Sequence, residues 1–312
     1  MKRYAPYLLV CLFFVSSFLS PKGLLAAPYY QGKRITIVVG FAPGGGYDRM
    51  ARLLAKYLPK YIPGEPTVII ENVPGGSSII AANQVYVAKP HGLTIGSINR
   101  GLPIAQLLKV EGIKFDIMKY AWIGSTSIDT NVLCVRTDLP HKSYDDLKKA
   151  KDTLFMATGG PMTSSNQFGV LLKEFLHLNI KIVTYTNMAD ALLSIERKES
   201  DGTTSTYSSL RPLLERKVIR PVLRSRNSET GIEKLPVDEE LTTDKMGKTL
   251  LGMRSITDQF GRPYVLPPGV PADMMNTLKD AFRKVAKDPG LLADSDKLML
   301  PVQYLPGEEI LP

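Results

Sequence analysis

Two glycine-rich segments, each between an apolar run and a helical pattern, constrain the fold of this chain most strongly. The apolar run at 34–39 is rich in β-branched residues, and three glycines follow at 44–46. From Met50 onward, apolar residues recur at spacings of three and four, which predicts a helix. The same order returns at 67–88 and leads into a third strand at 93–96. This alternation predicts a parallel sheet with helices on both faces.

A second unit of the same kind begins near Ser143, which together with Asp146 suits the capping box of a short helix. The apolar run at 154–157 leads into a glycine pair at 159–160, and a serine at 164 or 165 can cap the helix that follows. Further strands are expected at 181–185, 203–206 and 218–223, further helices at 168–176 and 189–197, a surface loop at 227–248 and an extended return segment at 263–266.

A chain of 312 residues is longer than one hydrophobic core usually serves, so we expect two lobes. We assign residues 28–131 and 254–312 to the first lobe and 132–253 to the second, because the chain builds one unit, builds another and returns. Ligand sites in open α/β sheets lie outside the carboxyl ends of the strands. The two glycine segments should therefore face each other across a cleft.

The first 27 residues have the layout of a secretory signal peptide, with Lys2 and Arg3, an apolar run at 7–19 and small residues at 26–27. The alternative is a membrane anchor, but the run is shorter than the ~20 residues that a spanning helix needs. We therefore expect a periplasmic protein. Cleavage would also remove Cys11 and leave Cys134 alone in an apolar run, which predicts a buried strand residue without an intramolecular disulfide.

The charge of the chain is positive but dispersed. Removal of 1–27 lowers the formal net charge from +9 to +6, because three basic residues and no acidic ones leave. Nucleic-acid binders usually concentrate basic residues in a stripe, and no such stripe is visible. We expect no nucleic-acid partner, and we interpret the excess either as mild attraction for anions or as an ordinary solvated surface. We also expect a monomer.

Glycine-rich turns from strand to helix leave backbone N–H groups unpaired at the positive end of a helix dipole, which suits a carboxylate or phosphate. The alternative is a tight connection without a ligand. The loop at 44–46 is not a nucleotide loop, because it lacks a Lys followed by Ser or Thr, and Arg49 stands where a dinucleotide fingerprint needs its third glycine. Asp48 either caps the following helix or orients a ligand group or a water.

Patterns of catalysis and metal binding are missing from the sequence. His91 lies in a predicted turn, and His141 and His177 flank helices, so all three are expected at the surface. Cys134 has no evident base partner, and neither a G-x-S-x-G elbow nor a metal-ligand spacing occurs. Trp122 is expected in the core or between the lobes. We predict no catalytic residues, no metal, no cofactor and no enzyme activity.

Three segments resemble the Bug/TctC-type receptors of tripartite tricarboxylate transporters. They run from Ile35 to Asp48, from Val68 to Gly76 and from Ala88 to Thr94, and weaker similarity extends over most of the mature chain. The resemblance implies a type II periplasmic binding protein, or Venus flytrap, that holds a carboxylate between loops of both lobes and delivers it to membrane subunits. The site residues that it implies are Phe41, Ala42, Pro43, Gly46, Tyr47 and Asp48 in the first loop, and Thr158, Gly159, Gly160, Thr163, Ser164 and Ser165 in the second.

Some residues depart from the pattern of the family. Tyr47 stands where a threonine is common, Met162 where glycine is frequent, and Asn166 where histidine is frequent. Arginines do not cluster in the two loops, so we expect a mono- or dicarboxylate with an apolar or aromatic body rather than citrate. Two alternatives stay open: a receptor that serves a sensor instead of a transporter, and a hydrolase or transferase that uses the glycine loops as an anion hole.

Overall fold

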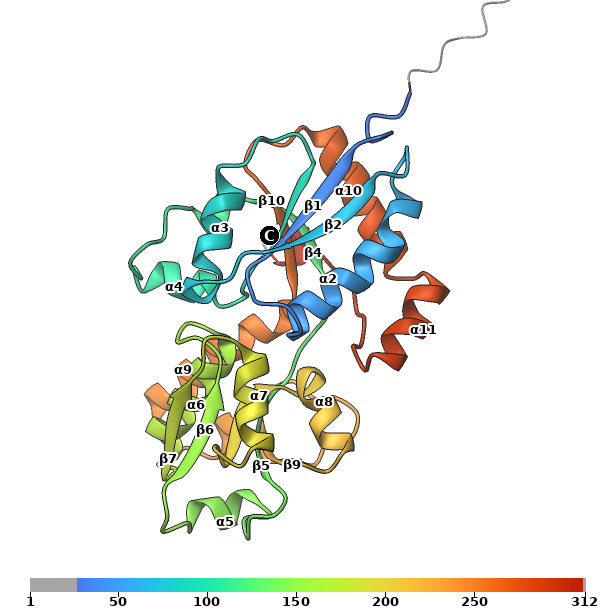
Figure 1. Ribbon diagram of the computed structural model, residues 1–312. Coiled ribbons are helices and arrows are strands. Elements are labelled where there is room, and N and C mark those ends of the chain that lie inside the picture. Colours follow the sequence, from blue (N-terminus) through green and yellow to red (C-terminus); the bar gives the residue numbers. More distant parts are fainter. Residues whose placement is uncertain (1–26, 311–312) are drawn as a thin grey trace, which may run out of the picture.

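The computed structural model describes residues 27–310, so the predicted signal peptide falls outside the described residues except for Ala27. Two separate sheets organise these residues (Figure 1). The first contains β1 (Arg34–Val39), β2 (Thr67–Asn72), β3 (Thr94–Ser97), β4 (Ala121–Ser125), β10 (Pro263–Leu266) and β11 (Leu305–Pro306). The second contains β5 (Asn131–Arg136), β6 (Leu154–Thr158), β7 (Ile180–Thr184), β8 (Gly202–Thr206) and β9 (Ile219–Arg224). We call the first sheet with its helices lobe 1 and the second with its helices lobe 2.

In both sheets the order of the strands in space differs from their order in the sequence, because the chain crosses over between strands. Lobe 1 has the order β11-β4-β10-β3-β1-β2, and lobe 2 has the order β7-β6-β8-β5-β9. The pairs β1–β2, β1–β3, β6–β7 and β6–β8 are parallel, as the alternation of strands and helices predicts, whereas β5 runs antiparallel to both β8 and β9. Strand β10 runs antiparallel to β3 and β4, because it brings the chain back from lobe 2 into the sheet of lobe 1.

Helices cover both faces of each sheet. Lobe 1 contains α2 (Gly46–Tyr57), α3 (Ile79–Tyr86), α4 (Leu102–Leu107), α10 (Ala272–Val285), α11 (Pro289–Lys297) and α12 (Gly307–Ile310). Lobe 2 contains α5 (Tyr144–Lys148), α6 (Ser164–Leu176), α7 (Met188–Glu196), α8 (Tyr207–Glu215) and α9 (Lys245–Ile256). Short 3₁₀ turns lie at Leu58–Tyr61, Gly76–Ser78, Ile117–Lys119, Asp238–Glu240 and Thr257–Phe260.

Alternating residues of β1 serve two cores, because successive side chains of a strand point to opposite faces. Ile37 packs in one cluster with Leu54 of α2 and Phe282 of α10. Val38 packs in the other cluster with Val85 of α3. Two apolar clusters therefore hold lobe 1 together, one on each face of its sheet.

The same alternation builds lobe 2. Leu133 of β5 packs with Phe168 of α6, whereas its neighbour Cys134 packs with Ile195 of α7 on the other face. Cys134 is fully buried and forms no disulfide within residues 27–310. Burial raises the pKa of its thiol well above the usual range, so Cys134 is an inert core residue. The prediction of a buried strand residue is confirmed.

The chain crosses between the lobes twice, first at 126–130 and again at 257–262, where it returns to lobe 1, and the two crossings lie side by side. In the first, Asp129 donates its backbone N–H to the carbonyl of Asp258 in the second, at 2.9 Å. Residue 253, where we predicted the return to lobe 1, falls inside α9, and Leu251 of that helix packs in the core of lobe 2. The predicted lobe boundaries otherwise stay a prediction.

Local predictions of two kinds were wrong. The N-cap of α6 is Thr163 rather than Ser164 or Ser165, because Thr163 has extended backbone angles and its Oγ1 accepts from the N–H of Asn166. The predicted surface loop at 227–248 contains the start of α9, whose N-cap Asp244 accepts from the N–H of Gly247 at 2.7 Å. The capping box of Ser143 and Asp146 is confirmed, and Trp122 is buried in the core of lobe 1.

Within residues 27–310, every helix is too short or too polar to cross a membrane.

Candidate ligand-binding site

A cavity of about 590 Å³ opens between the lobes, and both glycine loops line it. The lining includes the β1–α2 loop and the β6–α6 loop, as the carboxyl-end rule for α/β sheets predicts. The predicted site residues in the lining are Phe41, Ala42, Pro43, Gly46, Tyr47, Gly159, Gly160, Thr163, Ser164 and Ser165. The remaining two predicted residues, Asp48 and Thr158, are buried outside the lining.

Asp48 supports the first loop from behind. Its Oδ2 accepts from the backbone N–H of Gly44 at 2.9 Å and from Arg52 Nε at 3.0 Å, and its Oδ1 accepts from Asn72 Nδ2 at 2.9 Å. Burial alone would raise the pKa of this carboxyl, but the hydrogen bonds, led by that of Arg52, hold it below the usual range. Asp48 is therefore a charged brace for the loop, and the N-cap position of α2 is held by Gly45.

Tyr47 connects the first loop to the return crossing. Its hydroxyl donates to the carbonyl of Gly261 at 3.1 Å and accepts from the backbone N–H of Arg100 at 3.1 Å. Its ring lies against the ring of Phe41, with the centroids 4.6 Å apart. These contacts give the cavity an aromatic wall on the side of lobe 1.

The second loop is held from the opposite lobe. The backbone N–H of Met162 donates to Ser77 Oγ at 3.1 Å, and Asn99 Nδ2 donates to the carbonyl of Met162 at 3.0 Å. The side chain of Met162 also packs against an apolar cluster of lobe 1. Within its own lobe, Thr163 Oγ1 donates to the carbonyl of Gly160 at 2.7 Å. The residue that departs from the family pattern at 162 therefore makes a contact between the lobes.

Asn166, the other departure in the second lobe, does not line the cavity. Its Nδ2 donates to Thr158 Oγ1 at 3.0 Å and to Thr184 Oγ1 at 3.2 Å. It ties α6 to the ends of β6 and β7, behind the loop that faces the ligand space.

Several helices begin at the cavity. Gly46, Ser164 and Met188, the first residues of α2, α6 and α7, all line it, as does Ser209 in the first turn of α8. First-turn N–H groups lack partners within their helix and lie at the positive end of the helix dipole. The cavity is therefore a place where an anion is favoured over a cation.

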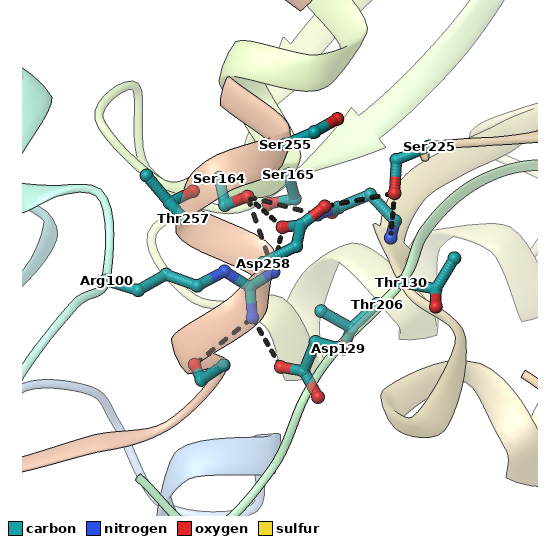
Figure 2. Close-up of polar contacts among 12 residues, drawn as sticks. Arg100, Asp129, Thr130, Ser164, Ser165, Thr206, Ser225, Ser255, Thr257 and Asp258 are labelled. Atoms are coloured by element: carbon teal, nitrogen blue, oxygen red, sulfur yellow. Dashed lines mark hydrogen bonds and ion pairs between the residues drawn. The ribbon is translucent and has the colours of Figure 1, made fainter. Parts of the chain in front are cut away.

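A buried ionic network forms the wall of the cavity where the two crossings meet (Figure 2). Arg100 bridges Asp129 and Asp258, and its Nη2 lies 3.2 Å from Asp258 Oδ1. Arg254 pairs with Asp258 at 3.1 Å, and Arg262 pairs with Asp129 at 3.2 Å. Three guanidinium groups thus share two carboxylates, and the carboxyl of Glu229, whose pKa burial raises to about 7, also interacts with Asp129 and Arg262.

Sequence reasoning missed this network. Arg100, Asp129 and Arg262 line the cavity, but they lie far apart in the chain and outside both glycine loops. One signal was available, because Arg254, Asp258 and Arg262 recur at a spacing of four just before the predicted return segment. Charged residues spaced in this way next to an apolar strand indicate a buried polar face.

The three histidines play no part in the cavity lining. His91 and His177 are exposed, as predicted, and His141 is half-buried.

The sequence matches the family model for the tripartite tricarboxylate transporter family receptor over residues 50–299. This match covers most of the chain. The chain belongs to this family. The predicted resemblance to this family is confirmed.

Relatives of known sequence or structure agree with this assignment. The chain is 28% identical to a UPF0065 protein of Bordetella pertussis, over 85% of this chain and 80% of that protein. The solved structure of the periplasmic binding protein BugD superimposes with a TM-score of 0.74 at 21% identity, over 90% of this chain and 92% of that one. R. palustris Rpa4515, solved with adipate, gives a TM-score of 0.71 at 21% identity, over 89% and 91% of the two chains. The two structures show that the fold is that of type II periplasmic binding proteins.

Proposed function

We propose that this protein is a periplasmic receptor that captures a small carboxylate between its two lobes. It acts as a monomer and delivers the ligand to the membrane subunits of a tripartite tricarboxylate transporter. The observation that carries the proposal is the cavity between the lobes, where helix N-termini and the buried guanidinium groups of Arg100 and Arg262 converge. The volume of about 590 Å³ suits a small organic anion.

The apolar part of the lining supports a ligand with an apolar body. Phe41 and Tyr47 form an aromatic wall, and Ile79, Met162 and Met188 also line the cavity. Rpa4515, which has the same fold, was solved with adipate, a dicarboxylate with an alkyl body. We therefore favour a mono- or dicarboxylate with an alkyl or aromatic body.

The ten predicted residues in the lining contact the ligand in this proposal, and Asp48 and Thr158 support them. The lobes close on the ligand, and the ligand shifts the balance between open and closed forms by its difference in affinity for the two. No bond in the ligand is made or broken. The receptor is therefore a carrier rather than an enzyme.

A thermal-shift screen of the mature protein tests the proposal. The panel contains mono-, di- and tricarboxylates, aromatic acids and amino acids, and calorimetry then measures the affinity of each hit. A ligand at 100 times its dissociation constant should stabilise the protein by about 2.7 kcal/mol. A panel in which no carboxylate stabilises the protein would contradict the proposal.

Gly45→Val tests whether the cavity is the site. Gly45 has φ −76° and ψ 171°, which any residue adopts, and a Cβ at this position would meet no atom within 4 Å. The variant should lose carboxylate affinity about tenfold or more, because its side chain enters the cavity, and it should lose only about 1 kcal/mol of stability, because valine is a poorer N-cap residue than glycine. Unchanged affinity would place the ligand elsewhere.

A further inference from the structure

We propose that Arg262, buried against the first turn of α2 at the wall of the cavity, binds one of two ligand carboxylates and thereby makes this receptor selective for dicarboxylates. The inference rests on the proposed function, and it names the residue that distinguishes a dianion from a monoanion. Three observations lead to it: how the charges of the cavity wall are paired, where the guanidinium of Arg262 lies, and what Gly46 permits.

Arg262 is the least neutralised arginine in the lining. Arg100, the other one, is paired with the carboxylates of both Asp129 and Asp258. Arg262 shares Asp129 with Arg100, and its side-chain hydrogen bonds within residues 27–310 are made by Nη1 and Nη2 to the hydroxyls of Ser127 and Ser208. Its Nε forms none there. Because Arg100 Nε also lacks a partner, what distinguishes Arg262 is its charge: a side chain that is 1% exposed has one shared carboxylate at the cavity, where Arg100 has two.

The position of Arg262 adds a second positive group to the start of a helix. A Cβ on Gly46, the first residue of α2, would lie 3.1 Å from Arg262 Nη2 and 3.5 Å from Nε. The guanidinium therefore lies against the unpaired N–H groups of a twelve-residue helix, which are themselves partially positive. Arg49 follows in the same first turn. An anion in the cavity would contact both the helix N-terminus and the guanidinium, and it would relieve their mutual repulsion.

Gly46 permits this approach. An alanine Cβ at this position would come within 2.5 Å of Ser209 Oγ as well as 3.1 Å of Arg262 Nη2. A side chain at this position would require Ser209 and Arg262 to shift, so the glycine favours the close approach of lobe 2 and the return crossing to the first loop. The site at Arg262 therefore depends on a glycine of the predicted motif.

The acid nearest in sequence to this helix start does not neutralise the site. Asp48 accepts from Gly44, Arg52 and Asn72, and it lies outside the cavity lining. The second loop, by contrast, offers neutral groups: the hydroxyl of Ser165 and the first turn of α6. One ligand carboxylate can be held there by neutral groups and the other at Arg262 by a charged one.

Calorimetry with paired ligands tests this assignment. The probes are adipate and succinate, each compared with its own monoamide, which has the same length and one charge fewer. The wild type should bind at least one dicarboxylate about tenfold or more tightly than its monoamide, because a charge-assisted hydrogen bond is lost in the amide. In Arg262→Gln this ratio should fall close to one.

Arg254→Gln is the matched control. Arg254 is equally buried, at 1% exposed, and pairs with Asp258 in the same network, but it does not line the cavity. This variant should lose stability and keep the preference for the dicarboxylate. Arg262→Lys, which retains the charge, should keep part of the preference.

If Arg262→Gln does not fold, Arg262→Met gives the same test, because it also removes the charge and keeps a side chain of similar length, and the ratio should again fall close to one. A ratio that survives in Arg262→Gln or Arg262→Met overturns the role of Arg262. A wild type that binds each dicarboxylate and its monoamide equally also overturns it, and in both cases the proposed function stands. A wild type that binds none of the four probes overturns it too, and the proposed function falls only if the whole carboxylate panel is blank.

Discussion

The two loops that face each other across the cavity are held in different ways. The first is braced within lobe 1, where Asp48 fixes Gly44 through a buried carboxylate. The second is braced across the cleft, where Met162 binds Ser77 and Asn99 of the other lobe. If the lobes close on the ligand as proposed, the brace of the first loop is present in both forms. The contacts of Met162 with lobe 1 would form only on closure, so we predict that closure completes the second half of the site.

The largest expected effect comes from breaking the brace of the first loop. Asp48→Asn removes a buried charge that accepts three hydrogen bonds, and the free energy of unfolding should fall by about 3 kcal/mol. Carboxylate binding should be lost with it. Urea denaturation and calorimetry measure the two effects.

Asp294→Asn is the control for this variant. Asp294 of α11 pairs with Lys56 of α2, the helix that also contains Asp48. Because Lys56 is exposed and Asp294 is partly exposed, its removal should cost less than about 1 kcal/mol and leave binding intact. If Asp48→Asn is no less stable than this control, the first loop is not held by its own lobe, and the contrast between the loops disappears.

The next effect concerns pH and the crossing that enters lobe 2. Glu229 accepts from the backbone N–H of Thr130 at 3.2 Å, and burial, with help from the charge of Asp129, raises its pKa to about 7. In the unfolded chain its pKa is near 4.5. Between these values the folded protein holds a proton that the unfolded chain has released, so this group lowers stability by about 2 kcal/mol as pH rises from 4.5 to 7.

Glu229→Gln should remove this dependence of stability on pH, which denaturation at a series of pH values measures.

A carboxylate of lobe 1 responds in the opposite direction. Hydrogen bonds from Tyr61 and Lys60 hold the pKa of Asp288 below its usual range, so its contribution is present at neutral pH and is lost as pH falls through that lower pKa. If the free energy of unfolding of Glu229→Gln falls between pH 4.5 and 7 as it does in the wild type, Glu229 is not the group responsible.

A smaller effect is expected from the contact that braces the second loop. Met162→Gly removes the side chain that packs on lobe 1, and it should weaken the closed form by about 1–2 kcal/mol. The radius of gyration of the ligand-free protein, measured by small-angle scattering, should increase. Met162→Leu keeps an apolar side chain and should behave as the wild type does. Identical scattering from the glycine variant would mean that the side chain of Met162 does not hold the lobes together, because the backbone bonds of residue 162 to Ser77 and Asn99 remain in this variant.

The smallest effect separates helix capping from ligand binding. Thr163→Ala removes the N-cap of α6 and a hydrogen bond within the second loop, which should cost about 1 kcal/mol. Ser143→Ala removes the N-cap of α5, far from the cavity lining, at a similar cost. Only the first variant should bind carboxylate more weakly. Equal affinities in the two variants would show that Thr163 acts on the helix alone.

Much of the fold was predictable because its signals are local. The β-branched run at 34–39 became β1 with the same bounds, and the pattern that starts at Met50 became the buried face of α2. Helix α9 was missed because its sequence is polar and contains two glycines, and its helical structure depends on the cap at Asp244 and on packing against α6. Local propensity is a weak guide where tertiary packing decides.

The candidate site also combines features that the sequence predicted with features that it did not. The glycines at 44–46 and 159–160 indicated two anion-binding turns, because a strand, glycines and a helix in succession leave N–H groups free. The sequence by itself therefore determined the fold class and which loops line the cavity. Only the tertiary structure decided what each residue does there: it turned Asp48 away from the ligand, made Met162 a contact between lobes and gathered Arg100, Arg254 and Arg262 around two aspartates. The physical reason is that local patterns lie in neighbouring residues, whereas the pairing of buried charges depends on which distant segments the two crossings bring together.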